Sequence, residues 1–328
     1  MYRDAKSQRV RIAAPVESAL ESGAPVVALE TTVISHGLPH PENLETLREC
    51  LEAVISEGAV PAVIGIVAGE PALGLSDAEI EHFAGGKAPD SSRIEKASLN
   101  NLGVFVAYRR WAATTVAGSL RVLSMAGLCA GSAKPVVFST GGIGGVHRGA
   151  AETFDVSSDL TALATTPVVC VCSGAKAILD LAKTLETLET LGVPVVGYRT
   201  SDFPAFYSQR SGLSLDSVAH TSADAAQAAV QHWRCGGRSA VLVCAPVPEE
   251  DGLPLATVER AIEKALTRAQ RLGIRGKALT PFLLAQMQLL TGGDTLRANR
   301  ALLVNNASVA ARIAVSLSQM GDKPHVSE

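Results

Sequence analysis

Short apolar runs alternate with amphipathic stretches along most of the 328-residue chain. Apolar runs bounded by glycine, proline or polar residues are typical of buried strands, and apolar residues repeated every three or four positions are typical of helices with one buried face. We expect strands at residues 25–37 (running into a loop), 61–69, 72–75, 103–107, 167–172, 193–200 and 239–244, and one ending at 138. We expect helices at residues 11–23, 43–58, 77–83, 223–233, 257–273, 281–290 and 295–317, one within 112–128, and one whose first turn holds Lys176 and which runs to 191.

This order of elements predicts the fold class. Strands that alternate with helices form a mainly parallel sheet with helices on both faces, a three-layer α/β/α architecture. No repeat, low-complexity tract or linker divides the sequence, so we expect one domain over residues 1–328, with polar tails at about 1–9 and 319–328. Ligands of such sheets bind where the strands end at their carboxyl edge.

Composition excludes several classes of protein. The chain is 47% hydrophobic with a formal net charge of −3, and no basic run with interleaved aromatic residues suggests binding to nucleic acid. The polar N-terminus lacks a signal-peptide core, and no apolar run approaches eighteen residues, which predicts a cytoplasmic protein with no membrane association. The six cysteines show no C-x-x-C pair, so we expect reduced, buried thiols and neither a disulfide framework nor a zinc site.

Two candidate catalytic residues follow buried apolar runs. Burial of Glu30 at the end of a strand would raise its pKa toward the range of a general acid, although a structural carboxylate that accepts backbone N–H groups is an equal alternative. Lys176 falls in the first turn of an expected helix, where the positive end of the dipole disfavours the ammonium and favours a nucleophilic amine. The alternative for Lys176 is a stem packed on the sheet with its ammonium in water.

The segment 140–160 carries the densest set of candidate site residues. Four glycines follow the strand that ends at 138, and they could let the backbone curl around an oxyanion with Arg148 as a further donor. His147 stands where a dinucleotide fingerprint requires its third glycine, so that motif is excluded. His147, Asp155 and neighbouring carboxylates could hold a divalent cation, and Mg²⁺ or Mn²⁺ fits this set better than zinc.

Three further features offer polar groups to a site. Lys96, at the edge of a polar loop, is a possible anion ligand or a solvated side chain. Two threonines open the helix within 112–128 and could cap it or bind an anion. Asn299 and Asn306 are seven residues apart and share a helix face that their apolar neighbours predict to be buried.

With these residues identified, the chain resembles the pseudouridine 5′-phosphate glycosidase (indigoidine synthase A-like) family over about residues 10–317. Eight ordered stretches carry the resemblance: ALETTVISHGLP (28–39), ATTVAGS (113–119), TGGIGGVHRGAAETFDVSSDL (140–160), VCSGAKAILD (171–180), LETLGVPVVGY (188–198), DFPAFYSQRSG (202–212), TPFLLA (280–285), and LTGGDTL with the later NNA (290–307). One such match could arise by chance, but eight in order specify the family.

The resemblance implies an activity and a role for each matching residue. The family breaks or forms the C–C bond between uracil and ribose 5-phosphate with a divalent metal, usually Mn²⁺, and forms homo-oligomers, typically trimers. Carried over, Lys176 is the covalent nucleophile that forms an iminium, Glu30 the proton donor or acceptor, and Asp155 the metal ligand. The substrate contacts would come from Lys96, the backbone around Val116, and Ser157, Ser158 and Asp159, with His147 and Asn299 on the base side.

Departures from the family pattern leave the aglycone open. Residues 99–103, 108–112 and 129–134 and Ala245 differ from the usual pattern, and Trp111 offers an aromatic surface for stacking. A C-ribosyl synthase that joins ribose 5-phosphate to a larger aromatic aglycone is therefore the main alternative. A catalytically silent ribose-phosphate binding protein is a third hypothesis, against which the retention of Glu30, Asp155 and Lys176 argues.

Overall fold

The computed structural model describes residues 10–130, 136–274 and 279–321. Its strands are β1 (Arg11–Ile12), β2 (Val26–Leu29), β3 (Val60–Val67), β4 (Glu70–Leu73), β5 (Glu95–Ala97), β6 (Ala112–Thr114), β7 (Val137–Ser139), β8 (Val169–Cys172), β9 (Val195–Tyr198), β10 (Ser217–Ala219) and β11 (Val241–Cys244). Its helices of four residues or more are α1 (Ala14–Ser22), η1 (Val33–Gly37), α2 (Glu42–Ser56), α3 (Asp77–Gly85), α4 (Leu102–Ala107), α5 (Val116–Met125), α6 (Ala150–Thr153), α7 (Ser158–Thr165), α8 (Leu181–Thr190), α9 (Ser222–Arg234), α10 (Leu255–Arg271), α11 (Leu279–Leu290) and α12 (Asp294–Gly321).

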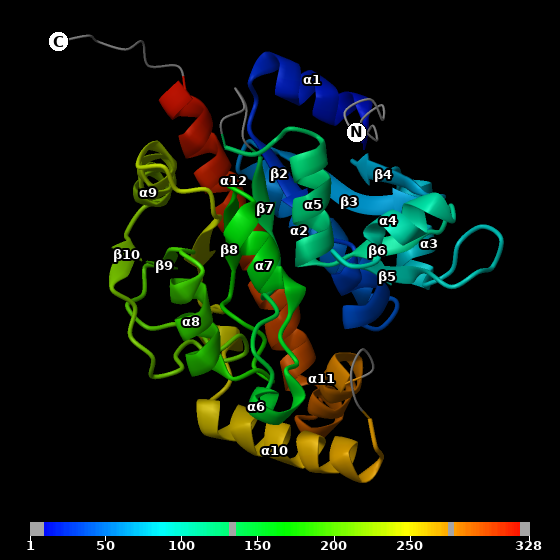
Figure 1. Cartoon of the computed structure of the whole chain (residues 1–328), viewed down its shortest axis with the longest axis vertical. Helices are drawn as coiled ribbons and strands as arrows, with labels where there is room; N and C mark the ends of the chain where they lie inside the picture. The colour runs from blue at the N-terminus through cyan, green and yellow to red at the C-terminus, as the bar shows by residue number, and fades with distance from the viewer. Residues whose placement is uncertain (1–9, 131–135, 275–278, 322–328) are drawn as a thin grey trace.

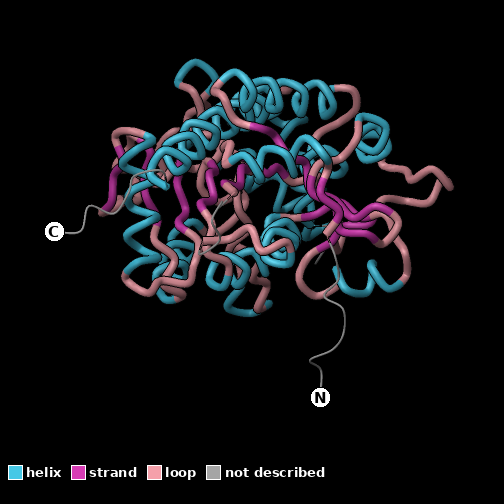
Figure 2. The backbone as a smooth tube through the Cα atoms, turned by 90° about the horizontal axis from the view of Figure 1, so that it is seen from above, coloured by secondary structure: helices cyan, strands magenta, loops and turns pink. Residues whose placement is uncertain are grey.

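The strands of the described residues form one sheet with helices on both faces. Its main path runs β1-β4-β3-β2-β7-β8-β11-β9-β10, with β6 and β5 branching from β3. Only the β3–β4 and β3–β6 pairs are antiparallel among the described strands. Figure 2 shows the strands as a layer between helices, and the predicted three-layer, mainly parallel α/β fold is confirmed.

The central strands hold the core. Every residue of β2, β8 and β11 is buried, which explains why these segments read as continuous apolar runs. Helices α2, α9 and α12 pack together on one face, and α5 packs with α7 on the other, in front of the sheet in Figure 1. Helices α10 and α11 pack together at the lower end of the molecule in that view.

Helix α12 runs through the protein interior. The stretch Asp294–Met320 is long and apolar enough to cross a membrane by composition, but it packs against β2, β7, β8 and the helices α2 and α9. Its apolar side chains therefore pack against other elements of the protein, as in the core helix of a globular fold.

Several predicted elements are wrong in type or in length. Residues 103–107, expected as a strand, belong to α4 (Leu102–Ala107). A short apolar run does not distinguish a strand from a helix, and this one lies half-exposed at the surface. The expected helix at 11–23 begins only at Ala14, after β1 has paired with β4. The three-residue strands β5, β6 and β10 were not predicted, since such lengths carry no periodicity.

The cysteine prediction is partly confirmed. All six thiols are free, and Cys50, Cys170, Cys172 and Cys244 are buried. Cys235 is exposed and Cys129 half-buried, so the expectation that every thiol is buried is wrong for these two. Cys235 directly follows the last residue of α9, and Cys129 lies in the connection after α5, so neither belongs to a strand or a buried helix face.

Candidate active site

A pocket of about 540 Å³ opens where several parallel strands end. Its wall combines acidic, basic, amide and apolar groups from segments far apart in the sequence. The lining residues are Glu30, Thr32, Val33, His36, Gly37, Lys96, Thr140, Gly141, Gly142, Lys176, Phe206, Thr280, Pro281, Leu284 and Asn299. The structure thus brings together four of the predicted site residues, Glu30, Lys96, Lys176 and Asn299.

Glu30 directly follows β2 and is 7% exposed. Burial raises the pKa of its carboxyl, and nearby Asp159 acts in the same direction, while Lys176, the Thr140 hydrogen bond and Lys96 oppose the rise. The Thr140 hydroxyl, which follows the neighbouring strand β7, donates to Glu30 Oε1. Glu30 therefore holds its proton to higher pH than an ordinary glutamic acid, as a general acid requires.

Lys176 does not lie in a helix, contrary to the prediction. Helix α8 begins at Leu181, with the Asp180 side chain capping it by accepting the Lys183 N–H. The residues before it pair instead with the glycine segment: Ile143 N–H donates to Gly174 O at 3.1 Å, and Lys176 N–H donates to Ile143 O at 3.0 Å. The helix-dipole argument for a neutral Lys176 thus has no structural basis, and the site places this residue through strand-like pairing.

The glycine segment is tight because other chain segments lie against it. A Cβ on Gly142 would lie 2.6 Å from the Phe206 ring, and a Cβ on Gly144 would lie 2.3 Å from Ser157 Oγ. Gly141 and Gly142 line the pocket, whereas Gly144 N–H already donates to Asp159 Oδ2 at 2.9 Å. The glycines chiefly allow close packing. Of the four expected to surround an oxyanion, only Gly141 and Gly142 line the pocket.

Arg148 is directed away from the pocket. Its guanidinium makes two hydrogen bonds of 2.8 Å to the carboxylate of Glu259 on α10, a bidentate ion pair, and two longer ones to the carbonyls of Ala177 and Leu179. The expectation that Arg148 binds a substrate anion is wrong, because its donors fasten α10 to the loop that carries Lys176.

Asp159 joins two walls of the site. Its two carboxylate oxygens accept the backbone N–H groups of Ala117 and Gly144, each at 2.9 Å. Ala117 directly follows Val116, which begins α5. Ser157 caps α7 through the Asp159 N–H, and Ser158 Oγ lies 2.7 Å from Ser98 Oγ. Val116, Ser157, Ser158 and Asp159 therefore sit together behind the glycine segment, and the lining of the pocket does not include them.

Lys96 completes a cluster of charges. It lies in β5, beside Ala113 of β6, and its side chain reaches the pocket. Lys96 keeps an exposed surface, but partial loss of water around its amine lowers its pKa, and the charge of Lys176 lowers it further, while Glu30 and Asp159 act against the shift. Two amines and two carboxyl groups thus influence one another at the edge of the sheet.

His147 and Asp155 form a separate pair beside the glycine segment. His147 Nδ1 lies 4.0 Å from Asp155 Oδ2, and burial lowers the pKa of the imidazole while Asp155 opposes that effect. No three side chains of His, Cys, Asp or Glu converge within the described ranges. This donor set does not suit zinc, whereas a hard cation that keeps most of its water shell needs only one or two carboxylates, and half-exposed Asp155 fits that mode.

Asn299 and Asn306 confirm the predicted buried face of α12. Asn299 is 7% exposed and lines the pocket. Asn306 is fully buried behind it, donating to Thr140 O at 2.9 Å and Gly141 O at 3.3 Å while accepting from Ser173 Oγ at 3.2 Å. One amide thus connects the loop after β7 with the loop after β8.

Comparison with known proteins identifies the family. The sequence profile described as "Indigoidine synthase A like protein" matches residues 15–316. The chain belongs to the indigoidine synthase A-like family. It is 51% identical over 305 residues to the pseudouridine-5′-phosphate glycosidase of Caldanaerobacter subterraneus subsp. tengcongensis, covering 93% of this chain and 95% of the relative. It is 49% identical over 320 residues to the enzyme of that name from Chloroflexus aurantiacus, covering 95% and 100%.

Solved structures of similar proteins have the same fold. A prealnumycin C-glycosynthase, in complex with ribulose 5-phosphate, superposes with a TM-score of 0.85 at 38% identity over 95% of this chain and 98% of that one. An indigoidine synthase A-like protein from Thermotoga maritima gives a TM-score of 0.84 at 35% identity, covering 97% and 99%. The resemblance inferred from the eight motifs is therefore confirmed.

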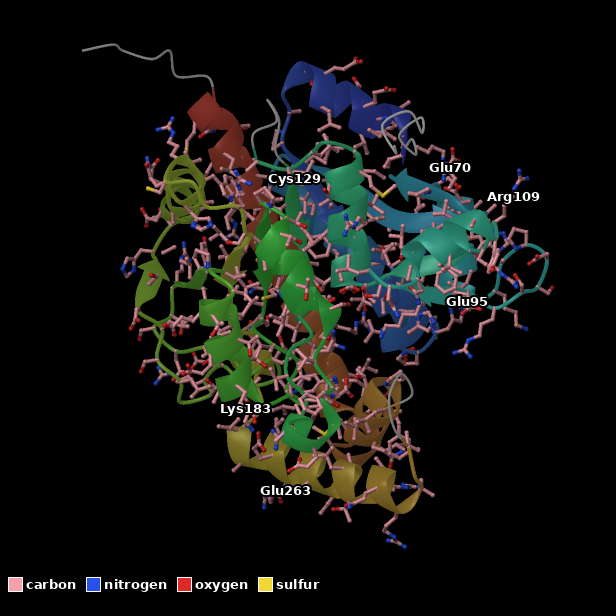
Figure 3. All side chains as sticks on the ribbon, viewed as in Figure 1. Glu70, Glu95, Arg109, Cys129, Lys183 and Glu263 are labelled. Atoms are coloured by element: carbon pink, nitrogen blue, oxygen red, sulfur yellow. The ribbon has the colours of Figure 1, made fainter. Side chains whose placement is uncertain are left out.

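The departure at residues 108–112 from the pattern of the indigoidine synthase A-like family lies away from the pocket. Trp111 packs its ring at 5.4 Å from His82 and 5.7 Å from Phe83 in a separate apolar cluster. Tyr108 is 70% exposed, and Arg109 projects from the outer edge of the molecule (Figure 3). The expectation that Trp111 stacks on a large aglycone is wrong, because its ring packs against His82 and Phe83 of α3.

Sequence reasoning missed several lining residues of this family member. Thr140 directly follows β7, so its place at a strand end could have marked it as a site residue. Pro281 and Leu284 belong to α11, a helix that the sequence predicted. His36 and Phe206 gave no such signal, because a histidine in a loop and an aromatic residue in a turn-rich segment have many alternative roles. Only the fold directs both toward Glu30 and Lys176.

Proposed function

We propose that this chain is a pseudouridine-5′-phosphate glycosidase, which cleaves or forms the C–C bond between uracil and ribose 5-phosphate. The observation that carries the proposal is the pairing, in one pocket, of a buried carboxyl with a raised pKa at Glu30 and a lysine at Lys176. The names of relatives near 50% identity support the same activity. Lys96 adds a cation suited to the sugar phosphate.

The chemistry explains this pairing. A C-glycoside has no leaving heteroatom, so the paired-carboxylate route of ordinary glycosidases is not available. In the proposed reaction Glu30 protonates the ring oxygen as the furanose opens, and the Lys176 amine bonds to C1′. The C1′–C5 bond then breaks with its electron pair moving to the base, which takes up a proton. The iminium left on Lys176 is hydrolysed by water to ribose 5-phosphate.

A divalent cation belongs to this proposal. Asp155 would hold Mn²⁺ or Mg²⁺ together with water. His147, which the resemblance puts on the base side, is not among the residues that line the pocket with Asn299, and its Nδ1 lies 4.0 Å from Asp155 Oδ2; its contact with the base stays a prediction. The bound cation would supply positive charge near the phosphate. The hydrogen bond from Ala117 N–H to Asp159 and the Ser157 cap hold Val116, Ser157, Ser158 and Asp159 close together, which is consistent with the contacts to the sugar phosphate that the resemblance implies.

A second candidate, the C-ribosyl synthase, keeps the same residues. The structural neighbour named as a C-glycosynthase, solved with ribulose 5-phosphate, favours this direction of the reaction. Trp111 no longer supports it, because the ring lies outside the pocket. The silent binding protein is disfavoured, since a binding site for a sugar phosphate needs no buried acid beside a lysine.

We also propose a homotrimer that works in the cytoplasm, as the family resemblance implies. Phe154 is 85% exposed and Val156 48% exposed on either side of Asp155, and a subunit contact would cover such an apolar surface.

The test uses purified enzyme with Mn²⁺, pseudouridine 5′-phosphate and borohydride. We expect uracil release and a mass increase at Lys176 from the reduced imine. Lys176→Ala should abolish both, whereas the matched control Lys183→Ala, which removes an exposed lysine of α8, should change neither. An adduct from ribose 5-phosphate without turnover of pseudouridine 5′-phosphate would favour the synthase, and full turnover by Lys176→Ala would refute the nucleophile.

A further inference from the structure

Lys176 is the first residue of a tight turn. The Leu179 N–H donates to Lys176 O at 3.0 Å, which closes the turn, and the two residues between them, Ala177 and Ile178, are buried. On the other side, the Lys176 N–H donates to Ile143 O at 3.0 Å. The backbone of this turn therefore sets the direction in which the lysine side chain enters the pocket.

Two carbonyl groups of the turn are held by one side chain from another segment. Arg148 Nη2 donates to Ala177 O and Arg148 Nε donates to Leu179 O, each at 3.3 Å. A carbonyl oxygen in a buried turn needs a hydrogen-bond partner, because leaving it unpaired costs free energy. Arg148 supplies this partner to both carbonyls without lining the pocket itself.

The guanidinium is fixed in turn by a carboxylate of α10. Arg148 Nη1 and Nη2 each lie 2.8 Å from one oxygen of Glu259. A bidentate pair of this kind holds the plane of the guanidinium, which the single ammonium of a lysine could not do. All three guanidinium nitrogens thus have partners, and they connect the Lys176 turn to α10.

Helix α10 extends this connection to another wall of the pocket. It packs against α11, and Arg268 Nη1 of α10 donates to Gln286 Oε1 of α11 at 2.8 Å. Helix α11 contributes Pro281 and Leu284 to the pocket lining. Arg148 is therefore the side chain through which the turn is joined to the helix pair that forms this wall.

From these contacts we propose that Arg148 is a positioning residue, which fixes the turn that directs the Lys176 amine toward the sugar. Bond formation requires the amine to lie about 3–3.5 Å from the carbon that it attacks, and a displacement of about 1 Å can slow a reaction about 100-fold. Because Arg148 does not line the pocket, its removal should affect the rate of imine formation and leave substrate binding in place. The inference rests on the proposed glycosidase function and adds the group that orients its lysine.

The test compares Arg148→Met, which keeps the stem without its donors, with Arg148→Lys, which keeps the charge without the planar fork. The matched control is Arg312→Met, which removes a similarly exposed arginine that pairs with Glu57 outside the pocket lining. We measure kcat and KM for pseudouridine 5′-phosphate, the rate of borohydride trapping of ribose 5-phosphate at Lys176, and hydrogen–deuterium exchange in residues 174–181.

The expected effect is a loss of rate with local loosening. In Arg148→Met, kcat and the trapping rate should fall by about tenfold or more, while KM changes by less than about twofold. The amides of Lys176 and Leu179 should exchange faster, and those of β11 should exchange as in wild type. Arg148→Lys should recover part of the rate, because an ammonium can still donate to one carbonyl. Arg312→Met should change neither kcat nor exchange in residues 174–181.

Other outcomes overturn the inference. A normal kcat in Arg148→Met means that the turn holds Lys176 without Arg148, and a higher KM at unchanged kcat places Arg148 at the substrate. An equal loss of kcat in Arg312→Met reduces the effect to general stability. If Arg148→Met does not fold, Arg148→Lys decides: wild-type kcat together with wild-type exchange contradicts the role.

Failure of the wild-type protein to turn over substrate or to trap the imine is a separate result. It refutes the proposed function, while hydrogen–deuterium exchange in Arg148→Met still judges whether Arg148 holds the turn.

Discussion

Glu30 lies between opposing influences that together set its chemistry. Removal from water favours the neutral acid, while the Thr140 hydroxyl and the two lysines favour the carboxylate. A fully charged Glu30 could not donate a proton to the sugar ring, and a carboxyl with no partners would be poorly oriented. The result is a carboxyl whose pKa is raised and whose orientation is fixed by the Thr140 hydroxyl.

Glu30→Gln should abolish catalysis and stabilise the fold at neutral pH. The unfolded chain loses this proton near the ordinary pKa of 4.5, whereas the folded protein holds it to higher pH. Stability from the protonated carboxyl is therefore fully present below pH 4.5 and is lost as the pH rises through the folded pKa. We expect turnover to fall by roughly 100-fold or more. Thermal melts should show Glu30→Gln above wild type at about pH 8 and equal to it at about pH 4; an unchanged difference across this range contradicts the raised pKa.

Thr140→Val should move the pH dependence of the reaction. Valine keeps the shape of the side chain but removes the hydrogen bond to Glu30, so the pKa of the carboxyl rises further. The limb of the kcat/KM profile on which activity falls with increasing pH should shift to higher pH. At the optimum, poorer orientation of Glu30 should lower kcat/KM by about tenfold. Ser139, the preceding residue, offers a control as Ser139→Ala, and a profile identical to wild type for Thr140→Val would refute the assignment.

At the scale of elements, α12 acts as the rear wall of the active site. Its residue Asn306 bonds to the loops that follow β7 and β8, and those loops carry the glycine segment and Lys176. The two loops also pair with each other beyond the ends of their strands, through the bridges Ile143↔Ala175 and His147↔Leu179. The position of Lys176 thus depends on a helix more than a hundred residues away in sequence.

Asn306→Asp should disturb this connection without changing side-chain size. A carboxylate cannot donate to Thr140 O and Gly141 O, and its charge would be buried beside two carbonyl oxygens. We expect a loss of about 3 kcal/mol in the free energy of unfolding, measured by urea denaturation. Imine trapping at Lys176 should slow as well. Asn305→Asp, on a half-buried neighbour that donates to Pro246 O, is the control, and equal effects of both variants would count against a specific role.

At the scale of the whole molecule, the parallel sheet places reactive groups from separate segments at one edge. Asp155 lies outside the pocket, which separates the proposed metal ligand from the charged cluster.

Chelation with EDTA should reduce turnover, and added Mn²⁺ should restore it. Asp155→Asn should need at least about tenfold more Mn²⁺ for half-maximal activity. Glu152→Gln on α6, which removes an exposed carboxylate nearby, should leave that requirement unchanged; a normal Mn²⁺ requirement in Asp155→Asn would exclude Asp155 as the ligand.

The exposed apolar residues beside Asp155 bear on assembly. Light scattering after gel filtration should give three times the chain mass of 34.0 kDa. Phe154→Ser should weaken the assembly if this surface is the subunit contact, whereas Leu272→Ser, at an equally apolar exposed position on α10's end, should not. A wild-type monomer would overturn the proposed trimer.

Much of the site could be predicted because the polar residues stand directly after apolar strands. Glu30 and Thr140 follow β2 and β7, and Asn299 shares a face with Asn306 by helical spacing. The error at Lys176 arose because the apolar spacing of residues 178–191 is helical throughout, yet pairing with the glycine segment and the Asp180 cap delay the helix to Leu181. Long-range pairing of this kind leaves no periodic signal in the sequence.

The sequence by itself determined the alternation of strands and helices, the family, and the presence of an acid and a lysine at strand ends, since local periodicity and contiguous motifs specify all three. Only the tertiary structure decided what each polar group contacts. It directed Arg148 to Glu259 and Trp111 to His82, and among the described residues it left His36 Nδ1 without a hydrogen bond. Contacts between distant segments depend on packing in three dimensions, and so the chemistry of the site was settled by neighbours that the order of residues does not reveal.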